Sequence, residues 1–176
     1  MKFFTSYKRI QFVSVILFTL YLSSCTYKDG LFPQKDKEGK FEISIPDFMS
    51  STNRLSEESN FQYQNRYRTI YMVIVDEKKS DSNHSFSSFT EENIQIFENS
   101  VDSLLTDSIF NLEINGLNAK QYKADALITG EGFYYSLTFI ESETDFYQIA
   151  KWTNHKRKKD YESLFDEMAL TFRILN

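Results

Sequence analysis

The strongest constraint on the fold is a tight turn, Asn115-Gly116, that lies between two segments of alternating apolar and polar residues. Residues 110–114 alternate before the turn, and residues 117–128 continue after it. Asn-Gly in this setting is the strongest short-range signal for a β-hairpin, because both residues accept the positive φ angles of a type I′ turn. The sequence therefore predicts an antiparallel pair of strands in the second half of the chain.

Six further segments extend this pair into a sheet. They alternate in polarity or are rich in β-branched and aromatic residues, which strands favour. The first ends at Pro46 and predicts a strand with one buried face, whereas the third is apolar at nearly every position and predicts a central strand covered on both faces. The segments are 41–45, 60–65, 68–75, the hairpin pair 133–140 and 146–152, and 170–174.

Two segments carry apolar residues at helical spacing. Thr90 is predicted to cap a helix that runs to about Thr106, and Asn154 to cap a second one, while residues 77–89 predict a loop. Both apolar stripes must be buried against the sheet. The sequence thus predicts an α+β domain, a mostly antiparallel central sheet with one helix on each face. The stripes are Ile94, Phe97, Val101, Leu104 and Leu105, then Tyr161, Leu164, Phe165, Met168 and Ala169.

The N-terminus has the layout of a secretory signal. A basic start is followed by an apolar run over residues 10–22, which at roughly 13 residues is too short to span a bilayer as a helix. The run ends in Leu22-Ser23-Ser24-Cys25, which resembles the lipobox of bacterial lipoproteins. The resemblance implies that residues 1–24 are removed and that Cys25 carries lipid. The alternatives are a coincidental cysteine after an ordinary signal peptide and an unprocessed N-terminal anchor.

Lipidation of Cys25 would fix where the protein works. Cys25 is the only cysteine, so it has no internal disulfide partner, and several acyl chains anchor a protein stably. We expect a membrane-anchored protein of the bacterial cell envelope, with the outer membrane facing the periplasm favoured and the inner membrane or the surface as alternatives. Residues 25–40 are predicted to form the lipidated cysteine and a flexible tether, and 41–176 the globular domain.

The mature chain is acidic and of single-domain size. Removal of Lys2, Lys8 and Arg9 leaves 17 of the 20 basic residues against 25 acidic ones, a net charge near −8. Such a balance argues against general nucleic-acid binding.

Four features in chain order resemble the PsbP-like fold, over residues 41–175. They are a strand ending at Pro46, the hairpin Asn115-Gly116 followed by Ala119, the paired aromatic strands 134–140 and 146–152, and the closing Leu170-Thr171-Phe172. The resemblance implies an α/β/α sandwich. It also points to binding and assembly proteins, since the fold hosts these in several settings. No metal or partner site is carried over from the family.

The chain contains no motif for catalysis, and we expect neither a cofactor nor a metal. His84 and His155 are its only histidines, so no zinc site can be assembled by spacing. The carboxylates Glu141, Glu143 and Asp145 cluster in a turn that we interpret as solvated.

The sharpest local feature is a basic run after the only tryptophan. Lys156, Arg157, Lys158 and Lys159 open a predicted helix, where the dipole disfavours cations. With Trp152 they form a possible interaction surface for anionic lipid or an acidic partner. The alternatives are a solvated turn for the basic residues and a place in the sheet core for Trp152.

These observations predict a non-enzymatic lipoprotein whose partners are membrane lipid, through acylated Cys25, and another envelope protein. The first alternative is a small-ligand carrier with a pocket between sheet and helix. The second is a carboxylate-dependent hydrolase, which would require two carboxylates at a defined separation.

Overall fold

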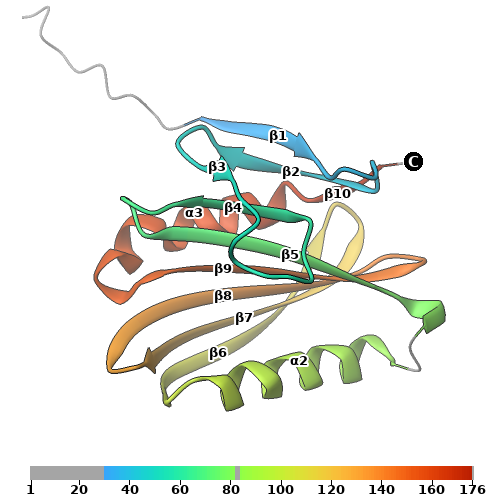
Figure 1. Ribbon diagram of the computed structural model, residues 1–176. Coiled ribbons are helices and arrows are strands. Elements are labelled where there is room, and N and C mark those ends of the chain that lie inside the picture. The colour runs from blue at the N-terminus through green and yellow to red at the C-terminus, as the bar shows by residue number, and fades with distance from the viewer. Residues whose placement is uncertain (1–29, 82–83, 176) are drawn as a thin grey trace, which may run out of the picture.

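The computed structural model describes residues 30–81 and 84–175 and has the α+β architecture that the sequence predicts (Figure 1). One sheet has seven strands in the order β3-β4-β5-β9-β8-β7-β6, and a small sheet has the order β1-β2-β10. All strand pairs are antiparallel. The strands are β1 (Leu31–Lys35), β2 (Phe41–Pro46), β3 (Ser50–Ser51), β4 (Phe61–Asn65), β5 (Ile70–Lys78), β6 (Ser103–Ile114), β7 (Leu117–Ile128), β8 (Glu131–Glu141), β9 (Asp145–Asn154) and β10 (Arg173–Ile174).

One helix covers each face of the seven-stranded sheet, as expected. Helix α2 (Phe86–Ser100) packs on one face, where Phe89 stacks on Phe146 of β9 with ring centroids 4.9 Å apart. Helix α3 (Lys158–Leu170) packs on the other, where Phe165 stacks on Tyr134 of β8 at 6.1 Å. Burial of one such aromatic ring contributes roughly 1.5–3 kcal/mol. Two short 3₁₀ helices, η2 (Lys79–Asp81) and η3 (His155–Arg157), precede α2 and α3 respectively.

The Asn-Gly hairpin is confirmed. Asn115 and Gly116 have φ angles of 51° and 82°, and Ile114 pairs directly with Leu117. The two-residue turn fixes the register of β6 against β7 from Ile114 back to Thr106, where a β-bulge shifts it.

The predicted first helix is wrong in its bounds. Ser85, not Thr90, caps it, because the Ser85 hydroxyl accepts a hydrogen bond from the Ser88 amide at 3.2 Å. Thr90 is buried inside the helix and donates to the Phe86 carbonyl at 2.8 Å. The helix ends at Ser100, and residues 103–106 belong to β6, since pairing with β7 outweighs their helical spacing. The predicted loop at 77–89 is correspondingly shorter at both ends.

The predicted tether is also wrong over residues 31–40. Strand β1 pairs with β2 from Leu31 opposite Pro46 to Lys35 opposite Glu42. The carboxylate of Asp36 closes the connecting turn by accepting hydrogen bonds from the amides of Glu38 and Phe41, both at 3.0 Å. Strand β2 is therefore a central strand with both faces covered, rather than a strand with one buried face. The predicted signal peptide and Cys25 lie outside the described residues.

Candidate functional site

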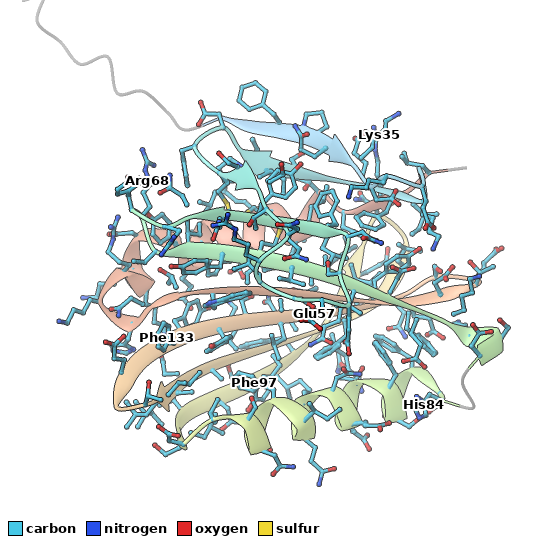
Figure 2. The ribbon with its side chains drawn as sticks, in the orientation of Figure 1. Lys35, Glu57, Arg68, His84, Phe97 and Phe133 are labelled. Carbon is cyan, nitrogen blue, oxygen red and sulfur yellow. The ribbon has the colours of Figure 1, made fainter. Side chains whose placement is uncertain are left out.

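The seven-stranded sheet has two ends that differ in chemistry. Figure 2 shows Arg68 and Phe133 at one end and His84 at the other. The β4–β5 turn lies beside η3, because Ile70 pairs with Thr153 of β9. We call these the Arg68 end and the His84 end.

Trp152 lies at the Arg68 end, on the sheet face that α2 covers. Its ring stacks between Tyr71 on β5 and Tyr135 on β8, with centroids 5.3 and 6.1 Å away. All three residues are opposite one another on neighbouring strands. Trp152 is half-buried, so the aromatic row is partly core and partly surface.

The predicted basic residues lie at the same end but divide into two pairs. Lys158 donates to Asp125 at 2.8 Å and lies over the Tyr134 ring, and Arg157 donates to Asp160 at 2.6 Å. Lys156 and Lys159 are exposed, and within the described ranges neither forms an ion pair. Lys158 approaches the α3 face, opposite to the face that carries Trp152. The predicted surface is thus one end of the sheet rather than one continuous patch.

A buried polar layer lies beneath α3. Lys151 of β9 is fully buried, and its amine donates to the Thr138 hydroxyl at 3.2 Å. Burial lowers the pKa of Lys151 to about 7. Beside it, Gln121 donates to both Ser136 and Asp166. Buried amines with lowered pKa values occur at active sites, but Lys151 has no exposed surface through which a substrate could reach it in this conformation.

A groove of about 660 Å³ lies at the His84 end, lined by residues that include Lys40, Lys78, Asp145 and Tyr147. The spaces beneath both helices are instead filled by buried side chains. One carboxylate oxygen of Asp145, Oδ1, is buried and has no hydrogen-bond partner among the described residues. In the same part of the chain, no group of three or more histidine, cysteine or acidic residues could hold a metal ion.

The most unusual surface is strand β6. It forms one edge of the seven-stranded sheet and, among the described strands, pairs only with β7. Every residue from 105 to 111 is exposed, and three of them are large and apolar: Leu105 at 52%, Ile109 at 54% and Phe110 at 46%. A β-bulge interrupts the pairing between Leu104 and Thr106. Natural edge strands are usually short or protected by charged side chains, proline or β-bulges. Strand β6 has twelve residues with no lysine or proline, and its protection is limited to the bulge and to Asp107 and Glu113.

The segment that carries α2 and β6 is acidic throughout. Residues 80–119 contain no lysine or arginine. Their acidic residues are Asp81, Glu91, Glu92, Glu98, Asp102, Asp107 and Glu113. The β6 edge therefore combines open backbone, exposed apolar side chains and negative charge. Because the spacing of apolar residues predicted a helix up to residue 106, the sequence did not predict this edge strand. The absence of lysine and arginine over 40 positions could have indicated its acidic character.

No protein-family model and no curated protein matches the chain. Solved structures do. CyanoP, the PsbP protein of the cyanobacterium Synechocystis, aligns with a TM-score of 0.62 at 13% identity over 88% of this chain and 99% of its own. The chain has a PsbP-like fold.

Two further structures share the PsbP-like fold. LpqN of Mycobacterium tuberculosis, a protein involved in cell envelope biogenesis, aligns with a TM-score of 0.61 at 9% identity, over 84% of this chain and 91% of its own. The Ran-binding protein Mog1p of Saccharomyces cerevisiae aligns with a TM-score of 0.59 at 10% identity, over 85% and 97%. Identities this low establish the fold and leave function to the chain's own residues.

Within the described ranges, no helix of the PsbP-like domain has the length and apolar character required to cross a bilayer.

Proposed function

We propose that the chain is a lipid-anchored protein of the bacterial cell envelope whose PsbP-like domain is a non-enzymatic protein-binding module. One observation carries the binding role, the open, apolar and acidic edge of β6. The proposal is also supported by the similarity in fold to LpqN, which is involved in cell envelope biogenesis, and to the Ran-binding protein Mog1p.

The edge suits a partner that adds a strand. In an antiparallel pair, about half of the backbone N–H and C=O groups of an edge strand point away from its neighbour. An extended peptide can pair with these groups, and its side chains then meet pockets on alternate faces. Ile109 and Phe110 point to opposite faces of the sheet and would contact the added strand on both.

Charge selects the kind of partner. Asp107 and Glu113 flank the two apolar residues on β6, and α2 contributes only acidic charge. A partner segment with lysine or arginine alternating with apolar residues complements this edge. A second copy of the chain would bring like charges together, which disfavours self-pairing.

The test is site-specific photocrosslinking of the full-length protein in its own cells. The photoreactive residue p-benzoylphenylalanine replaces Phe110 on β6, Tyr71 on the aromatic row, or Glu131 at the start of β8 as a control. We expect Phe110 to crosslink, above the Glu131 background, to one basic extended segment of another protein. Crosslinks to this chain's own β6, or to a segment that is not basic, would contradict the edge as the binding site.

Charge reversal provides the matched comparison. Asp107→Lys with Glu113→Lys should lower the crosslink yield about tenfold, since two like-charge contacts cost roughly 1–2 kcal/mol. Glu57→Lys with Glu58→Lys reverses two exposed acidic residues outside the edge and should change the yield little. Equal loss in both variants would indicate a general charge effect rather than recognition at β6.

The lipid anchor has its own test. Cys25→Ser should abolish incorporation of labelled fatty acid and release the protein from the membrane fraction. A variant that stays in the membrane fraction and carries the same label would contradict lipidation at Cys25.

The carrier alternative is favoured by the groove at the His84 end, where Asp145 lacks a partner for Oδ1. Native mass spectrometry of the protein extracted from its membrane would detect a retained ligand as added mass, and Asp145→Asn should then abolish retention.

A further inference from the structure

We propose that the Arg68 end of the domain lies against the anionic headgroups of the bilayer that holds the lipid at Cys25, with Arg66-Tyr67-Arg68 as the contact. This inference rests on the lipid anchor in the proposed function. It adds an orientation of the domain relative to the bilayer. A flexible tether of fifteen residues, as the sequence predicted, would not have imposed such an orientation.

The first step is the length of chain between lipid and domain. Strand β1 begins at Leu31, and the Gly30 carbonyl already accepts a hydrogen bond from the Asp47 amide at 3.2 Å. Only five residue spacings separate Cys25 from Gly30, a span of at most about 18 Å when fully extended. The longest strands of the domain have twelve residues, or about 40 Å. The domain therefore has one end held close to the membrane.

The second step is which end this is. Leu31 pairs with Pro46, and Phe48 follows two residues later. The Arg68 guanidinium lies 4.0 Å from the centre of the Phe48 ring, and Asn65 donates to the Phe48 carbonyl at 2.7 Å. The start of β1 thus lies at the Arg68 end (Figure 1).

The third step is the chemistry of that end. Tyr67 is 99% exposed at the tip of the β4–β5 turn, between Arg66 and Arg68. Tyrosine is enriched at membrane–water interfaces, and basic side chains near anionic lipid are attracted to it. Lys156, which is exposed on η3 beside this turn, adds a further cation.

One acidic residue of this end, Asp47, is exposed at the same corner, where Arg66, Arg68 and Lys156 outnumber it, and the others lie toward α3 and β6. Asp125 and Asp160 accept hydrogen bonds from Lys158 and Arg157. Glu131 begins β8, beside the β7–β8 turn and toward the β6 edge of the sheet. An anionic surface would therefore attract the β4–β5 corner and repel the β6 side, which leaves the β6 edge facing away from the lipid and open to a partner.

Fluorescence quenching in vesicles tests the orientation. Because Cys25 is lipidated, a second cysteine can be labelled alone, at Tyr67→Cys or, as the control at the His84 end, at Glu143→Cys. The lipidated full-length protein is placed in phosphatidylcholine vesicles with or without phosphatidylglycerol, and a headgroup-attached quencher is added. We expect quenching at position 67 to exceed that at 143 about threefold with phosphatidylglycerol, and the difference to shrink at high salt.

A charge-matched pair of variants completes the test. With the label at Lys156→Cys, Arg66→Gln with Arg68→Gln should weaken quenching, while Lys35→Gln with Lys37→Gln, two exposed lysines on and after β1, should not. Equal quenching at both labels, stronger quenching at 143, or a pattern indifferent to phosphatidylglycerol would overturn the inference. The mass of the N-terminal peptide distinguishes a failure of this orientation from a failure of the proposed function, because an unlipidated Cys25 would contradict the lipid anchor itself.

Discussion

Lys158 donates a hydrogen bond to Asp125 at 2.8 Å, and this contact assigns a structural role to a residue that the sequence placed on an interaction surface. Asp125 is buried and also accepts hydrogen bonds from Thr106 at 2.8 Å and from His155 at 2.9 Å. The cluster joins the start of β6, the neighbouring strand β7 and the first turn of α3. Lys158 is therefore committed to holding these elements together.

Asp125→Asn should destabilise the domain at neutral pH. Burial alone would raise the pKa of Asp125, but hydrogen bonds from Lys158, Thr106 and His155 outweigh it and hold the pKa below its ordinary value. Its ionised form thus stabilises the fold above the unfolded pKa of about 4, and this contribution is lost as the pH falls through the folded pKa. Urea unfolding at pH 7 should show a loss of about 1–3 kcal/mol.

The difference in the free energy of unfolding between the wild type and Asp125→Asn should shrink when unfolding is measured below about pH 4. Asp160→Asn, which removes an exposed partner of Arg157, is the control and should cost less than about 1 kcal/mol. A difference for Asp125→Asn that does not depend on pH would rule out the ionised carboxylate as its source.

Lys151→Met should stabilise the domain. The pKa of Lys151 is lowered to about 7 by burial, so between pH 7 and about 10 the unfolded chain holds a proton that the folded chain lacks. The free energy of unfolding of the wild type should therefore rise with pH across this window, and the variant should lack that rise. We expect the variant to gain about 1–3 kcal/mol at pH 7, with the gap narrowing toward pH 10 in thermal or urea unfolding. A variant less stable than the wild type would mean that the amine stabilises the folded state by more than its hydrogen bond to Thr138 accounts for.

Much of the fold follows from local patterns in the sequence. The Asn115-Gly116 turn, the bounds of β7 and the buried stripe of α3 are determined by residues within a few positions of one another. Ser85 illustrates the limit. Ser85 and Thr90 are both residue types that favour the N-cap, and the choice between them depends on which turn lets Phe86 and Phe89 reach the sheet.

Local sequence patterns could not predict the elements that depend on pairing with distant residues. Leu31–Lys35 has no alternating pattern and contains Pro33, so only its pairing with β2 makes it a strand. Proline is tolerated there because β1 is an edge strand of its sheet. The β6 edge was missed for the same reason, since the spacing of Leu104 and Leu105 fits a helix until β7 supplies a partner.

Tyr71→Ala should change the fluorescence of Trp152. Trp152 is the only tryptophan, and its ring is shielded by Tyr71 on one side and Tyr135 on the other. Removal of one stacked ring should shift the emission to longer wavelength, increase quenching by iodide and cost about 0.5–1.5 kcal/mol beyond the lost burial. Tyr67→Ala, which removes a fully exposed tyrosine, is the control and should leave the emission unchanged. An unchanged spectrum in Tyr71→Ala would contradict the stacked arrangement.

Asn115 has two roles in the hairpin, and two substitutions separate them. Its φ of 51° is left-handed, and its amide donates to the carbonyls of Leu170 at 3.2 Å and Phe172 at 2.7 Å, which ties the turn to the end of α3. Asn115→Gly keeps the backbone conformation and loses the hydrogen bonds, so it should cost about 1–2 kcal/mol. Asn115→Ala adds the strain of a left-handed alanine, roughly 1 kcal/mol more.

Thr129, in the β7–β8 turn, provides the matched control for these variants. It has a φ of 50°, and its hydroxyl donates only to the neighbouring Ile128 carbonyl. Thr129→Gly should relieve backbone strain and be neutral or stabilising by up to about 1 kcal/mol. If Asn115→Gly were as harmless as Thr129→Gly in urea unfolding, the contacts to Leu170 and Phe172 would contribute nothing, and the turn alone would explain the asparagine.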